Sequence, residues 1–120
     1  GISEVRRIAA MAEAYDMAVA PHCPLDAIAF SSCIQLDAAT PNVILQEQSI
    51  DIHDAGDDNP RMNFLKNKEV FNFNCGFVQI PEGPGLGVEV DEDFVKEQDK
   101  NRHNWKNPMW RTYDGTPIEW

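Results

Sequence analysis

Two short, largely apolar runs with a helical pattern between them constrain the fold of this chain more than any other feature. The runs are residues 17–20 (MAVA) and 43–46 (VILQ), each too short for a helix but suited to a strand buried on both faces. Their starts lie about 25 residues apart, which is enough for one helical crossover between parallel strands. The sequence therefore predicts an α/β fold in which these two strands lie parallel.

Helical periodicity flanks both predicted strands. Apolar residues at helical spacing predict a helix over residues 4–15, with Ser3 as its N-cap. A second apolar stripe predicts a helix over residues 26–36, with Asp26 near its start. The first half of the chain therefore has the order helix, strand, helix, strand.

The second half of the chain has weaker signals. We predict a short helix or turn over residues 63–67, and two strands, 77–80 and 88–90, around the turn sequence PEGPGLG. Three consecutive acids beginning at Asp91 open a last predicted helix, over residues 91–100. The remaining tail has few periodic signals.

Two parallel strands are too few for a stable sheet, so we expect the fold to be incomplete within these 120 residues. A (β/α)8 barrel takes roughly 250 residues. The chain also begins Gly-Ile-Ser-Glu, without a methionine. We therefore expect a longer protein whose other segments supply the neighbouring strands.

Composition argues against several functions. Twenty acidic and ten basic residues give a net charge of −10, which disfavours binding to the phosphate backbone of nucleic acids. No stretch approaches about 18 uninterrupted apolar residues, so we expect no membrane span, and no signal peptide is seen. The cysteines lack CxxC spacing and indicate reduced thiols in a cytoplasmic protein. Of the three, Cys23, Cys33 and Cys75, the last two are expected to be buried as small hydrophobic residues.

A histidine and a glutamate lie where the two predicted strands end. His22 stands between Pro21 and Pro24 after the first run, and Glu47 follows the second run. Proteins with parallel sheets place their chemistry at the carboxyl ends of the strands, and neighbouring strands share one edge. Imidazole exchanges protons near neutral pH, and a carboxyl group can orient it or donate to a substrate. The pair therefore suits proton abstraction beside a carbonyl or carboxylate group.

Plainer interpretations stay open for each residue. His22 can be an inert, hydrogen-bonded turn residue, and Glu47 can be a solvated acid at a strand end. Cys23 is disfavoured as a nucleophile activated by the histidine, because adjacent residues usually point apart. His53 is a candidate for a supporting role in the same pocket.

Five segments of the chain match one known pattern, in order and at matching spacing. They are GIS (1–3), MAEAYDMAVAPHCPL (11–25), LQEQS (45–49), PGLGVEVDE (84–92) and NPMWR (107–111). Together they resemble the acid-sugar dehydratases of the mandelate racemase subgroup in the enolase superfamily. The PGLG segment is widespread in the superfamily, whereas APHCPL combined with LQEQS is more specific.

The resemblance implies a fold that combines an N-terminal α+β lid domain with a (β/α)7β TIM-like barrel. Residues 17–20 and 43–46 would be the seventh and eighth strands of that barrel. Residues 1–75 would form its last βα units, and residues 76–120 would return to the lid domain. On this pattern the chain is not a complete fold alone.

The resemblance also implies an activity, the dehydration of a sugar acid by a lyase. His22 matches the general base that takes the proton alpha to the substrate carboxylate, and Glu47 matches the acid that stabilises the enolate-like intermediate. Both would contact the substrate, with His53 as a further candidate. Loss of the 3-hydroxyl then yields a 2-keto-3-deoxy acid. Galactonate is the expected substrate. The alternatives are another aldonate, such as gluconate or mannonate, or a non-catalytic assembly module derived from the barrel.

A Mg²⁺ ion and further protein segments complete the implied site. The acidic Mg²⁺ ligands of the family lie on earlier barrel strands, so no metal ligand is expected within this chain. Because the charge of the ion stabilises the intermediate, the chain alone is expected to be inactive. The expected partners are the N-terminal remainder of the enzyme, a small sugar acid and further copies in a homo-oligomer, with no nucleic acid and no membrane.

Overall fold

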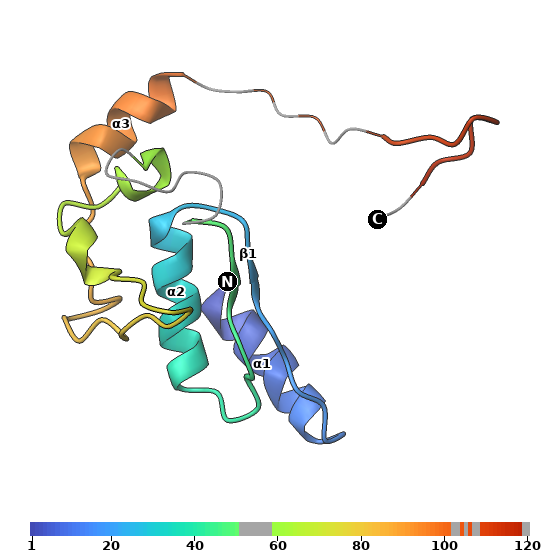
Figure 1. The fold of residues 1–120 in the computed structure, drawn as a ribbon, viewed down its shortest axis with the longest axis horizontal. Coiled ribbons are helices and arrows are strands. Elements are labelled where there is room, and N and C mark those ends of the chain that lie inside the picture. Colours follow the sequence, from blue (N-terminus) through green and yellow to red (C-terminus); the bar gives the residue numbers. More distant parts are fainter. Residues whose placement is uncertain (51–58, 102–103, 105, 107–108, 119–120) are drawn as a thin grey trace.

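The computed structural model of the chain describes residues 1–50, 59–101, 104, 106 and 109–118. None of the helices in these ranges is long and apolar enough to cross a membrane. In chain order the elements are α1 (Ile2–Glu13), β1 (His22–Cys23), α2 (Ala27–Ala38), β2 (Glu47–Gln48), two 3-10 turns (Pro60–Met62 and Lys68–Val70) and α3 (Glu92–Lys100) (Figure 1).

Strands β1 and β2 form a two-stranded parallel sheet, which confirms the predicted orientation. Helix α2 joins them and makes the crossover that parallel neighbours require. In register, His22 lies opposite Glu47 and Cys23 lies opposite Gln48.

The predicted strands over residues 17–20 and 43–46 are wrong in their bounds. Within these runs only Val19 and Val43 pair, through one isolated parallel bridge, and the regular ladder starts beyond both runs. Pro21 accounts for the interruption, because proline has no N–H to donate to the ladder.

Helix α1 begins two residues before its predicted start, and Ser3 is not its N-cap. The carbonyl oxygen of Gly1 accepts hydrogen bonds from the N–H groups of Glu4 and Val5, both at 3.1 Å, so the first turn closes before a Ser3 cap can form. Ala9 is the buried residue of this helix. In the predicted apolar stripe, Val5 and Ala12 are half-buried, whereas Ile8 and Tyr15 are exposed.

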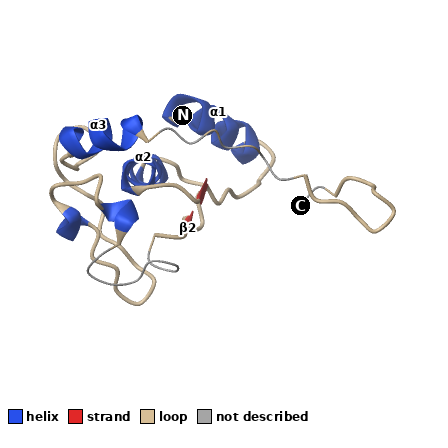
Figure 2. Cartoon of the chain, turned by 90° about the horizontal axis from the view of Figure 1, so that it is seen from above, coloured by secondary structure: helices blue, strands red, loops and turns tan. Residues whose placement is uncertain are grey.

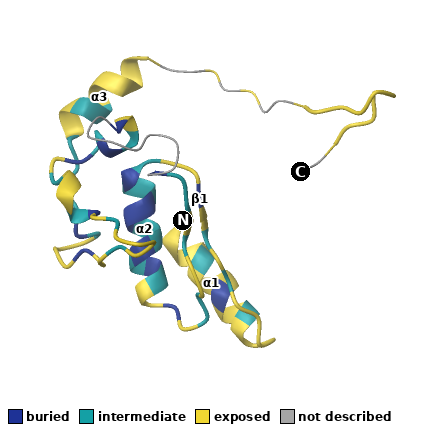
Figure 3. Cartoon of the chain, viewed as in Figure 1, coloured by how far each residue is buried: buried dark blue, intermediate teal, exposed yellow. Residues whose placement is uncertain are grey.

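Helix α2 is central to the fold and is capped as its sequence predicts. The carboxylate of Asp26 accepts hydrogen bonds from the N–H groups of Ile28 (2.9 Å) and Ala29 (3.1 Å). The helix continues to Ala38, two residues past the predicted end. Figure 3 shows its many buried positions, which are Ala27, Phe30, Ser31, Ile34 and Leu36.

The core joins α2 to the segment after residue 59. The ring of Phe30 meets Phe71 edge-on at 5.0 Å and stacks on Phe73 at 5.8 Å, measured between ring centroids. Ile50 and Leu65 are fully buried in the same cluster. The division predicted between residues 75 and 76 stays a prediction.

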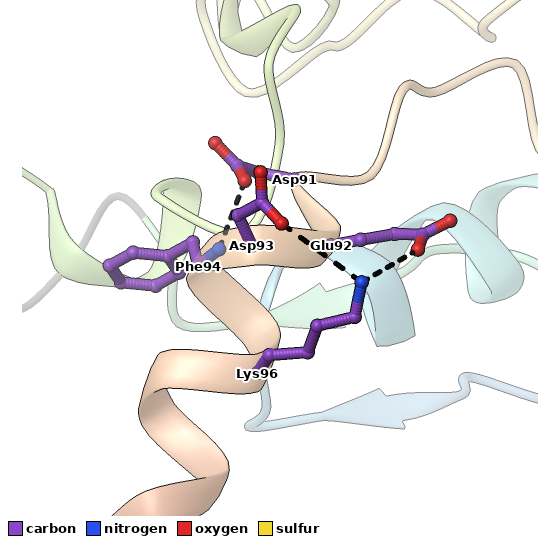
Figure 4. A network of polar contacts seen from close by, with 5 residues as sticks. All are labelled: Asp91, Glu92, Asp93, Phe94 and Lys96. Carbon is purple, nitrogen blue, oxygen red and sulfur yellow. Dashed lines mark hydrogen bonds and ion pairs between the residues drawn. The ribbon is translucent and has the colours of Figure 1, made fainter.

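Helix α3 confirms the last predicted helix. The carboxylate of Asp91 accepts a hydrogen bond from the N–H group of Phe94 at 3.0 Å (Figure 4). The Nζ atom of Lys96 lies 3.3 Å from Glu92 and 4.0 Å from Asp93, one turn earlier (Figure 4). These acids lie where the helix dipole favours negative charge.

The predicted strands 77–80 and 88–90 are wrong. Phe77 instead pairs with Asn74 across a tight turn, and Val90 forms an antiparallel bridge with Leu65. The predicted helix or turn over residues 63–67 lies between the two 3-10 turns and includes a turn at residues 63 and 64. In the second half of the chain, the turn sequences alone therefore predicted the wrong strand pairs.

The exposed turn at residue 75 also corrects a cysteine prediction. Cys75 is exposed rather than buried, because it lies at the tip of this turn, where its φ is 51° and that of Gly76 is 82°. The described C-terminal residues extend away from the rest of the chain in two perpendicular views (Figures 1 and 2).

Candidate active site

The parallel register brings the two predicted site residues together. His22 and Glu47 are Cα partners in the ladder at the carboxyl ends of the two runs. The N–H group of Glu47 donates to the carbonyl oxygen of Pro21 at 3.1 Å, and the side-chain amide of Gln46 donates to the same oxygen at 2.8 Å. The two strand ends are therefore fixed at the point where the side chains emerge.

The side chains of His22 and Glu47 contact each other directly. The Nδ1 atom of His22 lies 2.8 Å from the Oε2 atom of Glu47, and each side chain is 60% exposed. Because this contact uses Nδ1, the other ring nitrogen, Nε2, is the atom that can meet a ligand. A carboxylate that holds one imidazole nitrogen is a common way to orient a general base.

Arg61 supports the same strand ends, and the sequence interpretation did not identify it. Its Nη1 atom donates to the carbonyl oxygen of Pro24 at 3.1 Å and also to the hydroxyl oxygen of Ser49. The residues after β1 and after β2 are thus tied to one guanidinium group. The only local signal was Asn59, whose side chain accepts a hydrogen bond from the N–H group of Arg61 at 2.9 Å.

Cys23 points away from this pair. His22 is exposed, whereas Cys23 is only 2% exposed and belongs to the core cluster. Nearby, burial and then the neighbouring Cys23 thiol raise the pKa of Cys33 to about 12. Since the thiolate is the nucleophilic form, neither observation favours a cysteine nucleophile.

Two parts of the predicted site are not decided by the described residues. His53 lies outside the described ranges, so its supporting role stays a prediction. The prediction that His22 and Glu47 share one substrate cavity also stays a prediction. The hollow of about 340 Å³ beside β2 is lined by Gln46 and Gln48, not by Glu47.

The residues present do not fit Mg²⁺ on their own. Among the residues that the structure describes, no group of three or more histidine, cysteine or acidic side chains is placed to hold a metal ion. The pair of His22 and Glu47 offers one nitrogen and one carboxylate, whereas Mg²⁺ prefers an octahedral set of oxygen ligands.

Comparisons with known proteins find relatives over the whole of this chain. Two D-galactonate dehydratases, from Variovorax paradoxus (strain S110) and Ralstonia pickettii (strain 12J), are each 46% identical to the chain over 121 residues. The match covers 100% of this chain but only 31% of each relative. The chain therefore spans about a third of the length of these curated relatives.

A solved structure and a family model identify the fold. A protein of the mandelate racemase/muconate lactonizing enzyme type from Burkholderia SAR-1 matches with a TM-score of 0.70 and 27% identity, over 98% of this chain and 29% of that one. The resemblance and the partial α/β barrel fold inferred from the sequence are thus confirmed. Since residues 1–94 match the model "Enolase C-terminal domain-like", the chain belongs to that family.

Proposed function

We propose that this chain is the C-terminal part of a cytoplasmic, Mg²⁺-dependent hydro-lyase that dehydrates a sugar acid, with D-galactonate as the substrate. One observation carries the proposal. His22 and Glu47 meet at 2.8 Å at the ends of adjacent parallel strands, in a chain 46% identical to proteins named D-galactonate dehydratase.

In this proposal His22 is the general base. Its Nε2 atom takes the proton from the carbon alpha to the substrate carboxylate, and the electron pair moves onto that carboxylate. The C–O bond at carbon 3 then breaks, and the hydroxyl leaves as water with a proton from a group outside this chain. The resulting enol rearranges to a 2-keto-3-deoxy acid.

Glu47 has two tasks in this proposal. Its Oε2 atom holds the Nδ1 atom of His22, which fixes the orientation of the ring. Its Oε1 atom, when protonated, donates a hydrogen bond to the substrate carboxylate as that group gains negative charge. The Mg²⁺ ligands belong to segments outside this chain, and the bound ion would supply positive charge that stabilises the intermediate.

The test uses the full-length natural protein that contains these residues. It is incubated with D-galactonate, D-gluconate or D-mannonate, with Mg²⁺ or with a chelator, and the keto acid formed is measured. Turnover of galactonate supports the proposal. Turnover of gluconate or mannonate alone keeps the dehydratase class and changes the substrate. A folded wild type that is inert towards all three contradicts the proposal and favours a non-catalytic assembly module.

A further inference from the structure

Four buried side-chain oxygen atoms have no hydrogen-bond donor among the described residues, and three of them line one hollow near the end of α2. Those three are both carboxylate oxygens of Asp37 and the side-chain oxygen of Gln46, whereas the fourth, Oδ1 of Asn42, is not part of the hollow. Buried acceptors are almost always paired in native proteins, because an unpaired one loses its hydration without compensation. Three such atoms indicate that a donor group is missing from the described part of the chain.

The two residues line one hollow of about 280 Å³. Asp37 comes from the last turn of α2, and Gln46 comes from the residue before β2. The amide nitrogen of Gln46 donates to the carbonyl oxygen of Pro21 at 2.8 Å, so the unpaired atom is fixed as an acceptor. The missing group must therefore donate to a carboxylate and an amide oxygen from within the same hollow.

The ionisation of Asp37 agrees with the absence of a donor. Burial raises the pKa of Asp37 from 3.8 to about 6. A hydrogen bond from a positive charge would act in the opposite direction and favour the carboxylate. The titratable group that faces Asp37 on its own helix is the neutral thiol of Cys33, which offers no cation.

The rim of the hollow is apolar and exposed. Ile44 is 70% exposed and Ile80 is 49% exposed, and both line the hollow with the buried Ile34. A group that enters here must bring an apolar stem past the rim and hydrogen-bond donors to the floor. Arginine has this construction, with a planar five-donor head that is less strongly hydrated than the ammonium of lysine.

We propose that this hollow receives an arginine side chain from the part of the full-length protein outside these 120 residues. The proposal rests on the proposed function only in requiring that the chain belongs to a longer enzyme. The relatives contain further segments that could supply the donor, because the matched region is 31% of their length. The net charge of −10 on the chain also favours a basic partner surface.

The test measures whether substitution of Asp37 raises or lowers the Tm of the full-length natural protein. With an arginine bound, Asp37→Asn lowers the Tm by several degrees at pH 7, and Asp37→Leu lowers it further, because the guanidinium loses its counterion. The matched control is Asp93→Asn, whose side chain is 96% exposed and 4.0 Å from Lys96; because exposed charge interactions contribute little, its Tm is expected to fall much less than that of Asp37→Asn. An unchanged or higher Tm for both Asp37 variants overturns the proposal, because removing an unpaired buried charge stabilises a protein.

A second measurement needs no folded variant. Selective ¹³C labelling of aspartate in the wild type follows the titration of the Asp37 carboxyl, with its resonance assigned. A pKa below the ordinary value supports a bound cation, and a value still near 6 overturns the proposal. A donor supplied by a second copy of the chain also overturns it, and would appear as a Tm loss that depends on protein concentration. Neither readout uses turnover, so an inactive enzyme does not decide this question.

Discussion

His22 reaches Glu47 through backbone register rather than through a long loop. The ladder pairs their Cα positions, and the Pro21 carbonyl oxygen, which accepts from both Glu47 and Gln46, keeps the second strand in place. One side chain of the pair is proposed to move a proton, and the other to orient the ring and donate to the substrate. Single substitutions in the full-length protein should therefore affect the reaction to different degrees.

His22→Asn should abolish proton abstraction while the fold is kept. The two side chains are similar in size and both form hydrogen bonds, but the amide cannot accept the proton. In D₂O with Mg²⁺, NMR should detect exchange of the alpha proton of galactonate with the wild type and none with the variant. Wild-type rates of exchange and dehydration in the variant would make His22 a structural residue.

Glu47→Gln should cause a smaller loss, roughly 10²-fold in kcat, by analogy with the removal of one oxyanion donor. Glutamine keeps a hydrogen-bond donor but cannot carry the charge or transfer the proton of the acid. Glu82→Gln, in the exposed turn after Pro81, is the matched control and should have wild-type kcat. Equal kcat values for both variants would remove Glu47 from the proposed machinery.

Asp37 should make the 120-residue chain less stable as pH rises. Its pKa is about 6 in the folded chain, above its ordinary value of 3.8, so the folded state keeps a proton that the unfolded state has lost. The stability contributed by Asp37 is therefore complete below about pH 4 and is lost as pH rises through 6. Urea unfolding at several pH values should give a smaller decline for Asp37→Asn than for wild type. Parallel stability profiles would contradict the assignment.

At the scale of elements, the sequence predicted the features that depend on near neighbours. Asp26 and Asp91 cap their helices because capping joins residues two or three positions apart. The predicted strands around PEGPGLG failed because their real partners are distant. The side chain of Gln35 donates to the carbonyl oxygens of Pro81 (2.7 Å) and Leu86 (3.3 Å), and no local pattern contains that information.

Two glycines in the turn PEGPGLG (81–87) provide a matched test of its packing. Gly87→Ala should destabilise the chain strongly, because its added Cβ would lie 2.4 Å from the Cβ of Pro81 and 2.8 Å from its carbonyl oxygen. Gly85→Ala has a comparable positive φ, 66° against 75°, but no atom lies within 4 Å of its added Cβ. Both variants suffer backbone strain of about 1 kcal/mol. Chemical unfolding should therefore rank Gly87→Ala clearly below Gly85→Ala, and equal stabilities would contradict the close approach.

At the scale of the whole molecule, the chain is more extended than a compact domain. Its radius of gyration is 17.0 Å, whereas a compact domain of this length has about 14 Å. Large apolar side chains such as Ile44, Leu45 and Phe77 are exposed in the described residues. The sequence anticipated this incompleteness because two parallel strands are too few for a stable sheet. It did not anticipate Arg61, because that residue reaches the site across 37 positions of the chain from Pro24.

The exposed apolar surface predicts dye binding by the isolated chain. The 120-residue chain should bind a hydrophobic fluorescent dye, and the full-length protein should bind less, because its other segments cover the same surface. Leu45→Lys should reduce the fluorescence of the isolated chain, whereas Asn72→Lys, which adds the same charge at an exposed polar residue, should leave it unchanged. Equal dye binding by the two proteins would contradict an apolar surface covered in the longer protein.

The residues on either side of Glu47 make the partner of His22 sensitive to any shift in the strand register. Both neighbours, Gln46 and Gln48, are glutamines, so a slip of one position in either direction would place an uncharged amide opposite His22. A single inserted or deleted codon in the connection between the strands would thus leave most of the local sequence intact but would move Glu47 away from His22. Descendants of this gene should therefore tolerate exchanged residues in that connection far more readily than any change in its length.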